Sequence, residues 1–331
     1  MPLNAVSGSS CTIHLLQPPT VPASGAGSTT QPCAEYKHET TVDPTTGAVQ
    51  ETVTIESQQC PFEIALDVKP TAYSRIRSAT HSQPPIASDC VCEIYLDGIY
   101  IVSHVQPKTI GATQLPVHIA TIVSPDYSVI RSLQFATVNL VDPDQLPPAE
   151  RICEDQNVIK SLGTIRVDVF KCNSAYLQRM NWNGVPAVST SNQMKFSEKS
   201  KKACLATTAG LSAQSVSGLS PPSMQWYPQA AEATPFLQFI FDYKPRVILE
   251  AEGTIPQAAA PKVIVDSAKN ENNPKAQSKN NKRLKTEDGD DKMRGKTEGG
   301  DDNKRVKTED DDETVPQKTS KIIDLTGSDD M

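Results

Sequence analysis

Apolar and polar residues alternate along several well-separated stretches of this chain, and a period of two residues is typical of a β-strand with one buried face. Strands of this kind with Pro-rich connections can pack as two sheets with their apolar faces together. We therefore predict a mainly β fold, an antiparallel β-sandwich with one or two short helices, over residues 10–256. The alternating stretches are Thr52–Glu56, Phe62–Leu66, Glu93–Leu96, Thr164–Phe170 and Phe236–Phe241.

Turn-forming residues lie between these stretches. The segment Asp43–Gly47 should reverse the chain between strands at 39–42 and 49–56. The pair Asp97-Gly98 favours a tight hairpin that leads into a strand at Ile99–Val102.

Two helices are predicted beside the strands. One covers residues 197–205, with Ser197 as its cap, and the other lies within residues 244–253, with Pro245 near its first turn and Gly253 just past its end. Residues 17–32 and 206–233 are rich in Ser, Ala, Pro and Gly, which predicts long surface loops. We expect residues 1–9 to be disordered.

Charge is concentrated at the C-terminal end. Residues 266–331 hold 14 of the 32 Lys and Arg residues and 17 of the 39 Asp and Glu residues, and they include no aromatic residue. Such a segment has too little apolar surface to offset the entropy lost on ordering. We predict that residues 257–331, here called the C-terminal segment, are a disordered tail.

Four segments in this order resemble a fungal domain family of unknown function that is common in basidiomycetes. They are Glu35-Tyr36, Leu162–Val167, Glu198–Ala203, and Phe239–Glu252 followed by Gly253–Pro256. The resemblance covers roughly residues 10–256 and implies a β-rich domain of fungal origin. It implies no activity, and the Pro- and Ser-rich stretches after Leu16 and before Trp226 depart from the family pattern.

An 11-residue unit repeats within the C-terminal segment and places Lys285, Lys296 and Lys307 at equal intervals. In two copies an aliphatic residue precedes the lysine, at Leu284 and Val306, and acids follow it. This pattern resembles the extended consensus for SUMO attachment, in which the aliphatic residue and the acids bind the SUMO-conjugating enzyme. We predict Lys285 and Lys307 as SUMO acceptors. Lys296 follows Gly295 and should be a poor acceptor; the alternative is a solvated charge repeat.

Clusters of basic residues in the same repeats resemble signals for a nuclear import receptor, whose groove takes an extended basic chain. The chain has neither a signal-peptide-like start nor an apolar run long enough to cross a membrane, so we expect a nuclear protein with no membrane contact. The acids after each cluster disfavour direct DNA binding there. The predicted import residues are Lys282, Arg283, Lys285, Lys304, Arg305 and Lys307.

The last ten residues carry the most specific pattern. Ile322, Ile323 and Leu325 are large aliphatic residues in polar surroundings, and Asp324, Asp329 and Asp330 lie beside them. A segment of this type can add a β-strand to the open edge of a sheet, with aliphatic side chains in a groove and acids facing lysines. The pattern predicts a SUMO-interacting motif that binds SUMO or sumoylated proteins. Thr326 has an acid three residues later and is a predicted phosphorylation site that would add negative charge.

The sequence offers little support for catalysis. The phosphate-binding loop, the H-E-x-x-H helix and the G-x-S-x-G elbow are absent from it. The five histidines show no metal-ligand spacing, and the eight cysteines, which include Cys90 and Cys92, form no Cys-x-x-Cys pair and favour core packing. We predict no enzyme, no cofactor and no metal.

The preferred hypothesis is thus a non-catalytic nuclear interaction protein whose folded domain binds an unknown protein partner. The alternative is a chromatin- or transcription-associated protein that binds nucleic acid through basic residues of the domain, namely Lys199, Lys201 and Lys202. An unrecognised enzyme is a third hypothesis and would need a deep pocket with converging polar groups.

Overall fold

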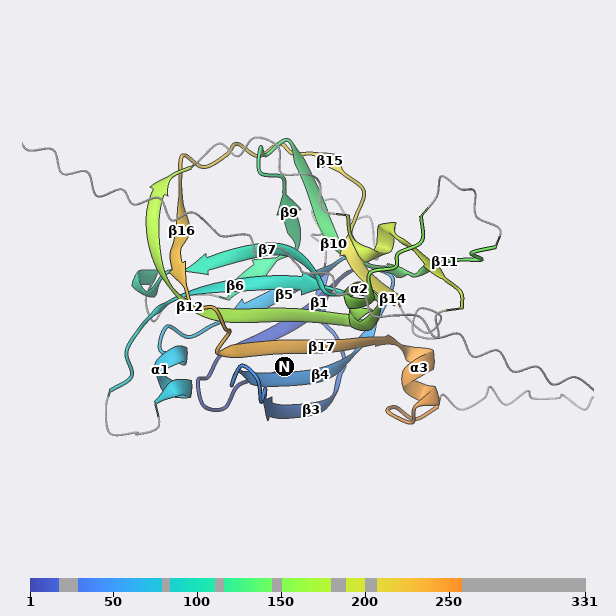
Figure 1. The fold of residues 1–331 in the computed structure, drawn as a ribbon, viewed down its shortest axis with the longest axis horizontal. Helices are drawn as coiled ribbons and strands as arrows, with labels where there is room; N and C mark the ends of the chain where they lie inside the picture. Colours follow the sequence, from blue (N-terminus) through green and yellow to red (C-terminus); the bar gives the residue numbers. More distant parts are fainter. Residues whose placement is uncertain are drawn as a thin grey trace, which may run out of the picture. The chain divides into compact units, whose positions relative to one another are not determined.

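The computed structural model describes most of the N-terminal part of the chain, and the described residues all belong to one compact unit that spans Met1–Lys262 (Figure 1). They are residues 1–17, 29–78, 84–110, 116–144, 151–179, 189–199 and 207–257. The fold is mainly β with several antiparallel sheets, as predicted. No helix in these ranges is both long and apolar enough to span a membrane.

The largest sheet has seven strands and contains most of the predicted alternating stretches. Its order is β3-β4-β17-β12-β6-β7, and β16 pairs with the far half of the long strand β12. All pairs in it are antiparallel except β4 with β17, which is parallel. The strands are β3 (Glu35–Val42), β4 (Val49–Ser57), β6 (Asp89–Leu96), β7 (Ile99–Gln106), β12 (Thr164–Gln178), β16 (Met224–Ala231) and β17 (Leu237–Pro245).

A second, four-stranded antiparallel sheet has the order β2-β1-β5-β8. Its strands are β1 (Ser10–Gln17), β2 (Thr29–Pro32), β5 (Phe62–Asp67) and β8 (Val117–Ile119). An isolated β-bridge joins Pro61, which directly precedes β5, to Gln134 in β10, a strand of a third sheet. The third sheet contains β9 (Thr121–Val123), β10 (Val129–Thr137), β14 (Thr207–Leu211) and β15 (Ser215–Val216), and a parallel pair joins β11 (Asn139–Val141) to β13 (Lys195–Ser197).

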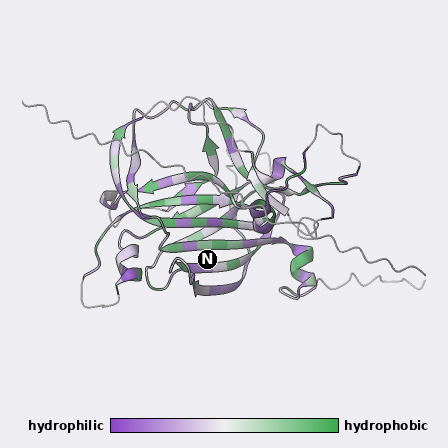
Figure 2. Cartoon of the chain, viewed as in Figure 1, coloured by the Kyte–Doolittle hydropathy of each residue, from purple (hydrophilic) through white to green (hydrophobic). Residues whose placement is uncertain are grey.

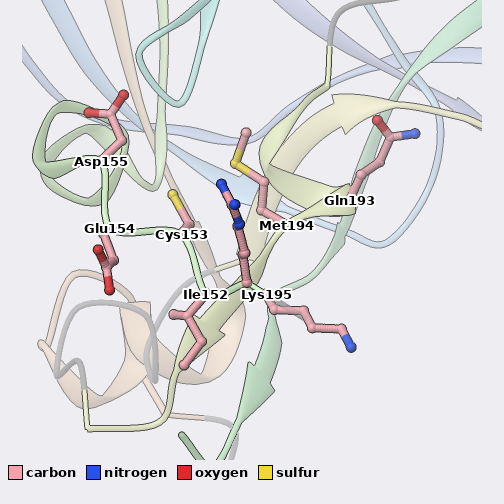
Figure 3. A pocket seen from close by; sticks show the side chains of 8 residues that line it. Ile152, Cys153, Glu154, Asp155, Gln193, Met194 and Lys195 are labelled. Atoms are coloured by element: carbon pink, nitrogen blue, oxygen red, sulfur yellow. The ribbon is translucent and has the colours of Figure 1, made fainter. Parts of the chain in front are cut away.

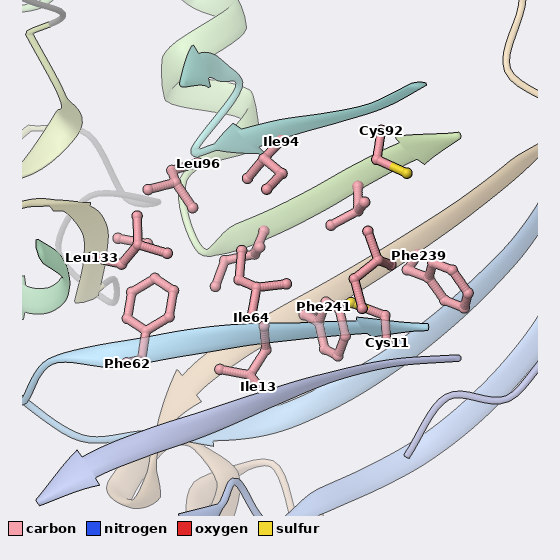
Figure 4. Packing of buried hydrophobic residues seen from close by; sticks show 14 of the residues in the cluster. Cys11, Ile13, Phe62, Ile64, Cys92, Ile94, Leu96, Leu133, Phe239 and Phe241 are labelled. Atoms are coloured by element: carbon pink, nitrogen blue, oxygen red, sulfur yellow. The ribbon is translucent and has the colours of Figure 1, made fainter. Parts of the chain in front are cut away.

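The main core lies between the four-stranded and the seven-stranded sheet. Ile13 of β1 and Ile64 of β5 point toward Ile94 of β6 and Phe241 of β17 (Figure 4), and all four side chains are fully buried. Burying one such side chain contributes roughly 2 kcal/mol. Hydrophilic and hydrophobic residues alternate along the central strands (Figure 2), and in β17 Phe239, Phe241 and Tyr243 are buried while Ile240 and Asp242 are only partly buried. The shared core of the two sheets confirms the predicted sandwich.

Both predicted turns are present. The Asp43 carboxylate accepts a hydrogen bond from the backbone N–H of Thr45 at 2.8 Å, and β3 and β4 pair on either side of this turn. At the second turn, Asp97 and Gly98 have φ angles of 50° and 79°. These positive values match a tight hairpin turn, and they join β6 to β7.

Three short α-helices occur among the described residues, together with two 3₁₀ turns, η1 (Lys108–Ile110) and η2 (Ser191–Gln193). The helices are α1 (Ala72–Arg77), α2 (Gln156–Ser161) and α3 (Arg246–Ala251). The helix predicted within residues 244–253 is confirmed as α3, but it starts later than expected, because Lys244 and Pro245 are the last residues of β17. Gly253 follows the helix with a φ of 68°. The helix predicted to start at Ser197 is wrong there, because Ser197 is the last residue of β13 and pairs with Val141. Its continuation, residues 200–205, lies outside the described residues.

The loop predicted at 206–233 is wrong over much of its length, and only short stretches such as residues 217–223 lack a strand or helix. This segment contributes β14, β15 and β16, and every residue of β14 is buried. Gly210 of β14 has no room for a side chain, since a Cβ there would lie 2.1 Å from Oδ1 of Asn192. The loop predicted at 17–32 is wrong at its end, where Thr29–Pro32 forms β2; residues 18–28 lie outside the described residues.

Residues 1–9 are ordered, against the prediction of disorder. The side chain of Asn4 is buried, and its amide donates a hydrogen bond to Glu51 Oε1 at 2.7 Å. Ser7 and Ser9 are buried as well, and Leu3 forms a β-bridge with Ser10. Composition does not reveal this order, because it comes from polar contacts, such as those of Asn4 with Glu51 and of Ser9 with Lys69, and not from an apolar run.

Candidate functional site

The residues predicted to act in the C-terminal segment lie outside the described residues. This holds for the SUMO-binding residues Ile322–Leu325 with Asp329 and Asp330, for Thr326, for the acceptors Lys285 and Lys307, and for the import clusters. They remain predictions from the sequence.

The basic residues of the nucleic-acid hypothesis are described only in part. Lys199 Nζ lies 2.9 Å from the Asp144 carboxylate, so its charge faces an acid. Lys201 and Lys202 lie outside the described residues. The described part of this neighbourhood, which ends at Lys199, gives no support for a surface that binds phosphate.

The second sheet brings together three side chains that are far apart in the sequence. His14 lies on β1 directly opposite Glu63 on β5, and His118 on β8 lies opposite Ala65, two residues from Glu63. Residues two apart on a strand share a face, so these three side chains project from the same face of the sheet. Ile13 and Ile64, one residue away, point into the core and are fully buried. The three polar residues therefore occupy the face away from the core.

The cluster of His14, Glu63 and His118 is compact. Nδ1 of His14 and Nδ1 of His118 each lie 3.1 Å from Oε1 of Glu63, and the three ligand atoms lie within 4.8 Å of one another. The two imidazole rings are 6.4 Å apart and tilted by 52°. The side chain of Glu63 is 11% exposed, that of His14 is 23% exposed and that of His118 is 51% exposed. The carboxylate is thus buried beneath two imidazoles that solvent reaches from one side.

Imidazole nitrogen and carboxylate oxygen are ligands that first-row transition metals accept. The same atoms can also form hydrogen bonds without an ion, if each neutral imidazole donates its Nδ1–H to the carboxylate. The cluster is therefore a candidate metal centre with a hydrogen-bonded alternative. No histidine was predicted as a metal ligand, because these two are 49 and 55 positions from Glu63 and only the register of three strands brings them together.

A second carboxylate, Asp97, is completely buried in the turn between β6 and β7. Its Oδ1 accepts hydrogen bonds from the backbone N–H groups of Gly163 and Thr164 and from the Tyr243 hydroxyl, at 2.9, 3.3 and 2.5 Å. Its Oδ2 accepts from the Ser191 hydroxyl at 2.6 Å and from the Ala209 N–H at 3.0 Å.

Burial raises the pKa of the Asp97 carboxyl from 3.8 to about 6, and hydrogen bonds, among them those from Ser191 and Tyr243, offset part of this rise. Five donors occupy both oxygens, so no position is left for a ligand. Through these hydrogen bonds, Asp97 connects the turn before β7 to the start of β12, to η2, to β14 and to β17. Its role is therefore structural.

An open hollow of about 620 Å³ lies between residues 151–155, which precede α2, and residues 193–195, which lead into β13. Figure 3 shows Glu154 and Asp155 on one side of it and Gln193 on the other. The carboxylate of Asp155 caps α2, because it accepts from the N–H groups of Asn157 and Val158. The polar groups do not converge on one point, and the hollow lacks the arrangement expected for a catalytic pocket.

The described cysteines are free thiols and mostly buried. Burial raises the pKa of Cys33 and of Cys90 to about 12, and it raises that of Cys92 well above 9.0. A thiol of this kind is neutral at physiological pH and is a poor nucleophile and metal ligand. The prediction that Cys90 and Cys92 pack in the core is confirmed.

The described residues define a β-sandwich domain with a candidate metal centre on the outer face of its smaller sheet. The chain belongs to the DUF7918 family, a domain of unknown function, whose model matches residues 29–258, well over half of the chain. Neither curated proteins nor solved structures gave a match. The resemblance to an uncharacterised domain family is thereby confirmed.

Proposed function

We propose that this chain is a non-catalytic nuclear interaction protein that binds SUMO by β-strand addition through its last ten residues and offers Lys285 and Lys307 as SUMO acceptors. The folded domain binds a further protein partner, whose identity the family leaves open. The resemblance to a fungal domain family supports a fungal source for the chain.

The observation that carries this proposal is the pattern at the end of the chain. Three large aliphatic residues occur within four positions, and acids stand between and after them. In β-strand addition, backbone hydrogen bonds to a sheet edge supply affinity while alternate side chains enter pockets and supply specificity. Ile322, Ile323 and Leu325 supply the pocket residues, and Asp324, Asp329 and Asp330 pair with lysines beside the groove.

The expected affinity is modest. Burying each aliphatic side chain contributes roughly 2 kcal/mol, and the entropy lost on ordering the strand leaves a Kd on the order of micromolar. Phosphorylation of Thr326 adds negative charge next to the lysines of the groove and strengthens binding.

Binding is tested by titrating labelled SUMO with the full chain and with the double variant Ile323→Ala and Leu325→Ala. A loss of affinity on the order of 100-fold or more is expected, because two aliphatic contacts disappear. The matched control is Val263→Ala with Val265→Ala, in another aliphatic run beside an acid, Asp266. If the control variant loses binding and the terminal variant keeps it, the assignment to the last ten residues is wrong.

The acceptor assignment has its own control within the repeats. In a reconstituted conjugation reaction, Lys285→Arg and Lys307→Arg should each remove one modified band, and Lys296→Arg should change nothing, because Gly295 cannot make the aliphatic contact. Equal modification of all three lysines would show that the aliphatic residue does not direct the reaction.

Nuclear import is tested by following the full chain in cells by fluorescence. Replacing Lys282, Arg283 and Lys285 together with Lys304, Arg305 and Lys307 by alanine should move the protein out of the nucleus, since the import groove recognises clustered positive charge. The double variant of Ile323 and Leu325 keeps these charges and should remain nuclear.

A further inference from the structure

We propose that His14, Glu63 and His118 bind one divalent first-row transition-metal ion, for which Zn²⁺ is the natural probe. This site lies in the folded domain and is independent of the SUMO-binding function proposed for the C-terminal segment.

The spacing of the three side chains fits such an ion. In a tetrahedral zinc site the bonds to nitrogen and oxygen are about 2.0–2.2 Å long, which places neighbouring ligand atoms roughly 3.3 Å apart. The distance from either Nδ1 to Oε1 of Glu63 is 3.1 Å. An ion can therefore enter between these atoms with small side-chain movements and no change of strand register.

Charge favours a cation at this point. In the part of the chain that the structure describes, no lysine or arginine pairs with Glu63, and the contacts of its carboxylate are the two imidazoles. A carboxylate with little solvent exposure needs a compensating positive charge or several donors. Asp97 has five donors, whereas Glu63 has only two imidazole nitrogens within reach, so its carboxylate has room to bind a metal ion in place of those hydrogen bonds.

The ligand types select the class of metal. Two nitrogens and one oxygen suit Zn²⁺ and its neighbours in the first transition row, whereas Ca²⁺ and Mg²⁺ favour six or more oxygen ligands. The half-exposed side chain of His118 leaves solvent access for a water molecule as the fourth ligand. Three protein ligands and one open position can also hold an exchangeable small ligand.

Binding should stabilise the domain, because the three ligands come from three adjacent strands. His118 lies on β8, a three-residue strand at the edge of the sheet that pairs with β5 through Ile119, His118 and Val117. An ion shared with β1 and β5 fixes this short strand in place. A ligand that binds the folded state and not the unfolded state raises the stability of the folded state.

The test is a calorimetric titration of the metal-free full chain with Zn²⁺ under reducing conditions. One ion per chain is expected for the wild type. Loss of an outer-shell partner costs about 10–100-fold in affinity, so removing a ligand in Glu63→Gln or His118→Ala should cost at least about 100-fold. The matched control is His38→Ala, since His38 forms the other exposed His–Glu contact, with Glu35 at 3.3 Å, and should bind zinc like the wild type.

Circular dichroism establishes whether each variant is folded. If Glu63→Gln unfolds, His118→Ala still tests the proposal, because the side chain of His118 is half exposed and its removal should leave the fold intact. Substitution with Co²⁺ reports on the ligand type: weak visible bands of a nitrogen and oxygen site are expected, without the intense thiolate absorption that cysteine ligands give. Zinc affinity that is equal in wild type and both variants would overturn the proposal, as would a thiolate band. In either case the cluster is a hydrogen-bonded one.

Discussion

Two buried carboxylates in this domain have opposite surroundings. Asp97 is fully enclosed in the turn between β6 and β7 and accepts five hydrogen bonds from the protein itself. Glu63 lies on the outer face of the four-stranded sheet, contacts two imidazoles and has a route to solvent beside His118. The number of internal donors thus distinguishes a carboxylate that holds the fold from one that is available to a ligand.

The largest expected effect follows from removing the Asp97 carboxylate. Asp97→Ala leaves five donors without an acceptor and places alanine at a φ of 50°, so the free energy of unfolding should fall by on the order of 4 kcal/mol. Urea unfolding measures this change. The control is Asp43→Ala, in an exposed turn, which should cost under about 1 kcal/mol; equal losses in both variants would remove the distinction between the two turn aspartates.

A second prediction concerns the pH dependence of stability. The pKa of Asp97 is raised in the folded state from 3.8 to about 6, so its contribution to stability is fully present below pH 3.8 and is lost as the pH rises through about 6. The free energy of unfolding of the wild type, relative to Asp97→Asn, should therefore fall by up to about 3 kcal/mol across this window. Parallel pH profiles for the two proteins would mean that the carboxyl does not titrate in this way.

Removing one donor to Asp97 should have an intermediate effect. Tyr243→Phe deletes the hydroxyl that donates to Oδ1 at 2.5 Å in the buried network and should lower the free energy of unfolding by about 2 kcal/mol. Tyr95→Phe is the matched control, because the Tyr95 hydroxyl donates to Glu93 in a part-buried position. A larger loss for Tyr95→Phe than for Tyr243→Phe would contradict the structural role given to Asp97.

The smallest effect is expected at Glu63 without metal. In Glu63→Gln the amide oxygen still accepts a hydrogen bond from a neutral imidazole, and the site is open to water, so the free energy of unfolding of the metal-free protein should change by less than about 1 kcal/mol. Denaturant titration in the presence of a chelator measures this change in the free energy of unfolding. A loss as large as that of Asp97→Ala would place Glu63 among the structural carboxylates.

Local patterns in the sequence predicted much of the fold. Alternation indicated β4, β5, β6, β12 and β17, and Asp97-Gly98 indicated its hairpin. Strand β14 was missed because its residues, Thr207–Leu211, are small and lack alternation, and its burial comes from pairing with β10. The helix at Ser197 was wrong because pairing with β11 outweighs local helix propensity there.

The candidate site could not be predicted from the sequence. His14, Glu63 and His118 form no motif along the chain, and they meet only because β1, β5 and β8 are adjacent in a particular register. A register shift of one residue between β1 and β5, or between β5 and β8, would point one of the ligand side chains into the core. Asp97 was recognised as a turn residue, but its donors come from four other segments that local reasoning could not connect to it.

Thermal unfolding of the wild type, Asp97→Asn and Glu63→Gln, each with and without Zn²⁺, tests the distinction between the two carboxylates most directly. We expect Asp97→Asn to have a lower Tm than the wild type under both conditions and to keep the rise in Tm that zinc causes. Glu63→Gln should have nearly the Tm of the metal-free wild type and show no rise with zinc. A zinc-dependent rise in Tm that survives in Glu63→Gln would show that Glu63 is not a metal ligand and does not differ from Asp97 in this way.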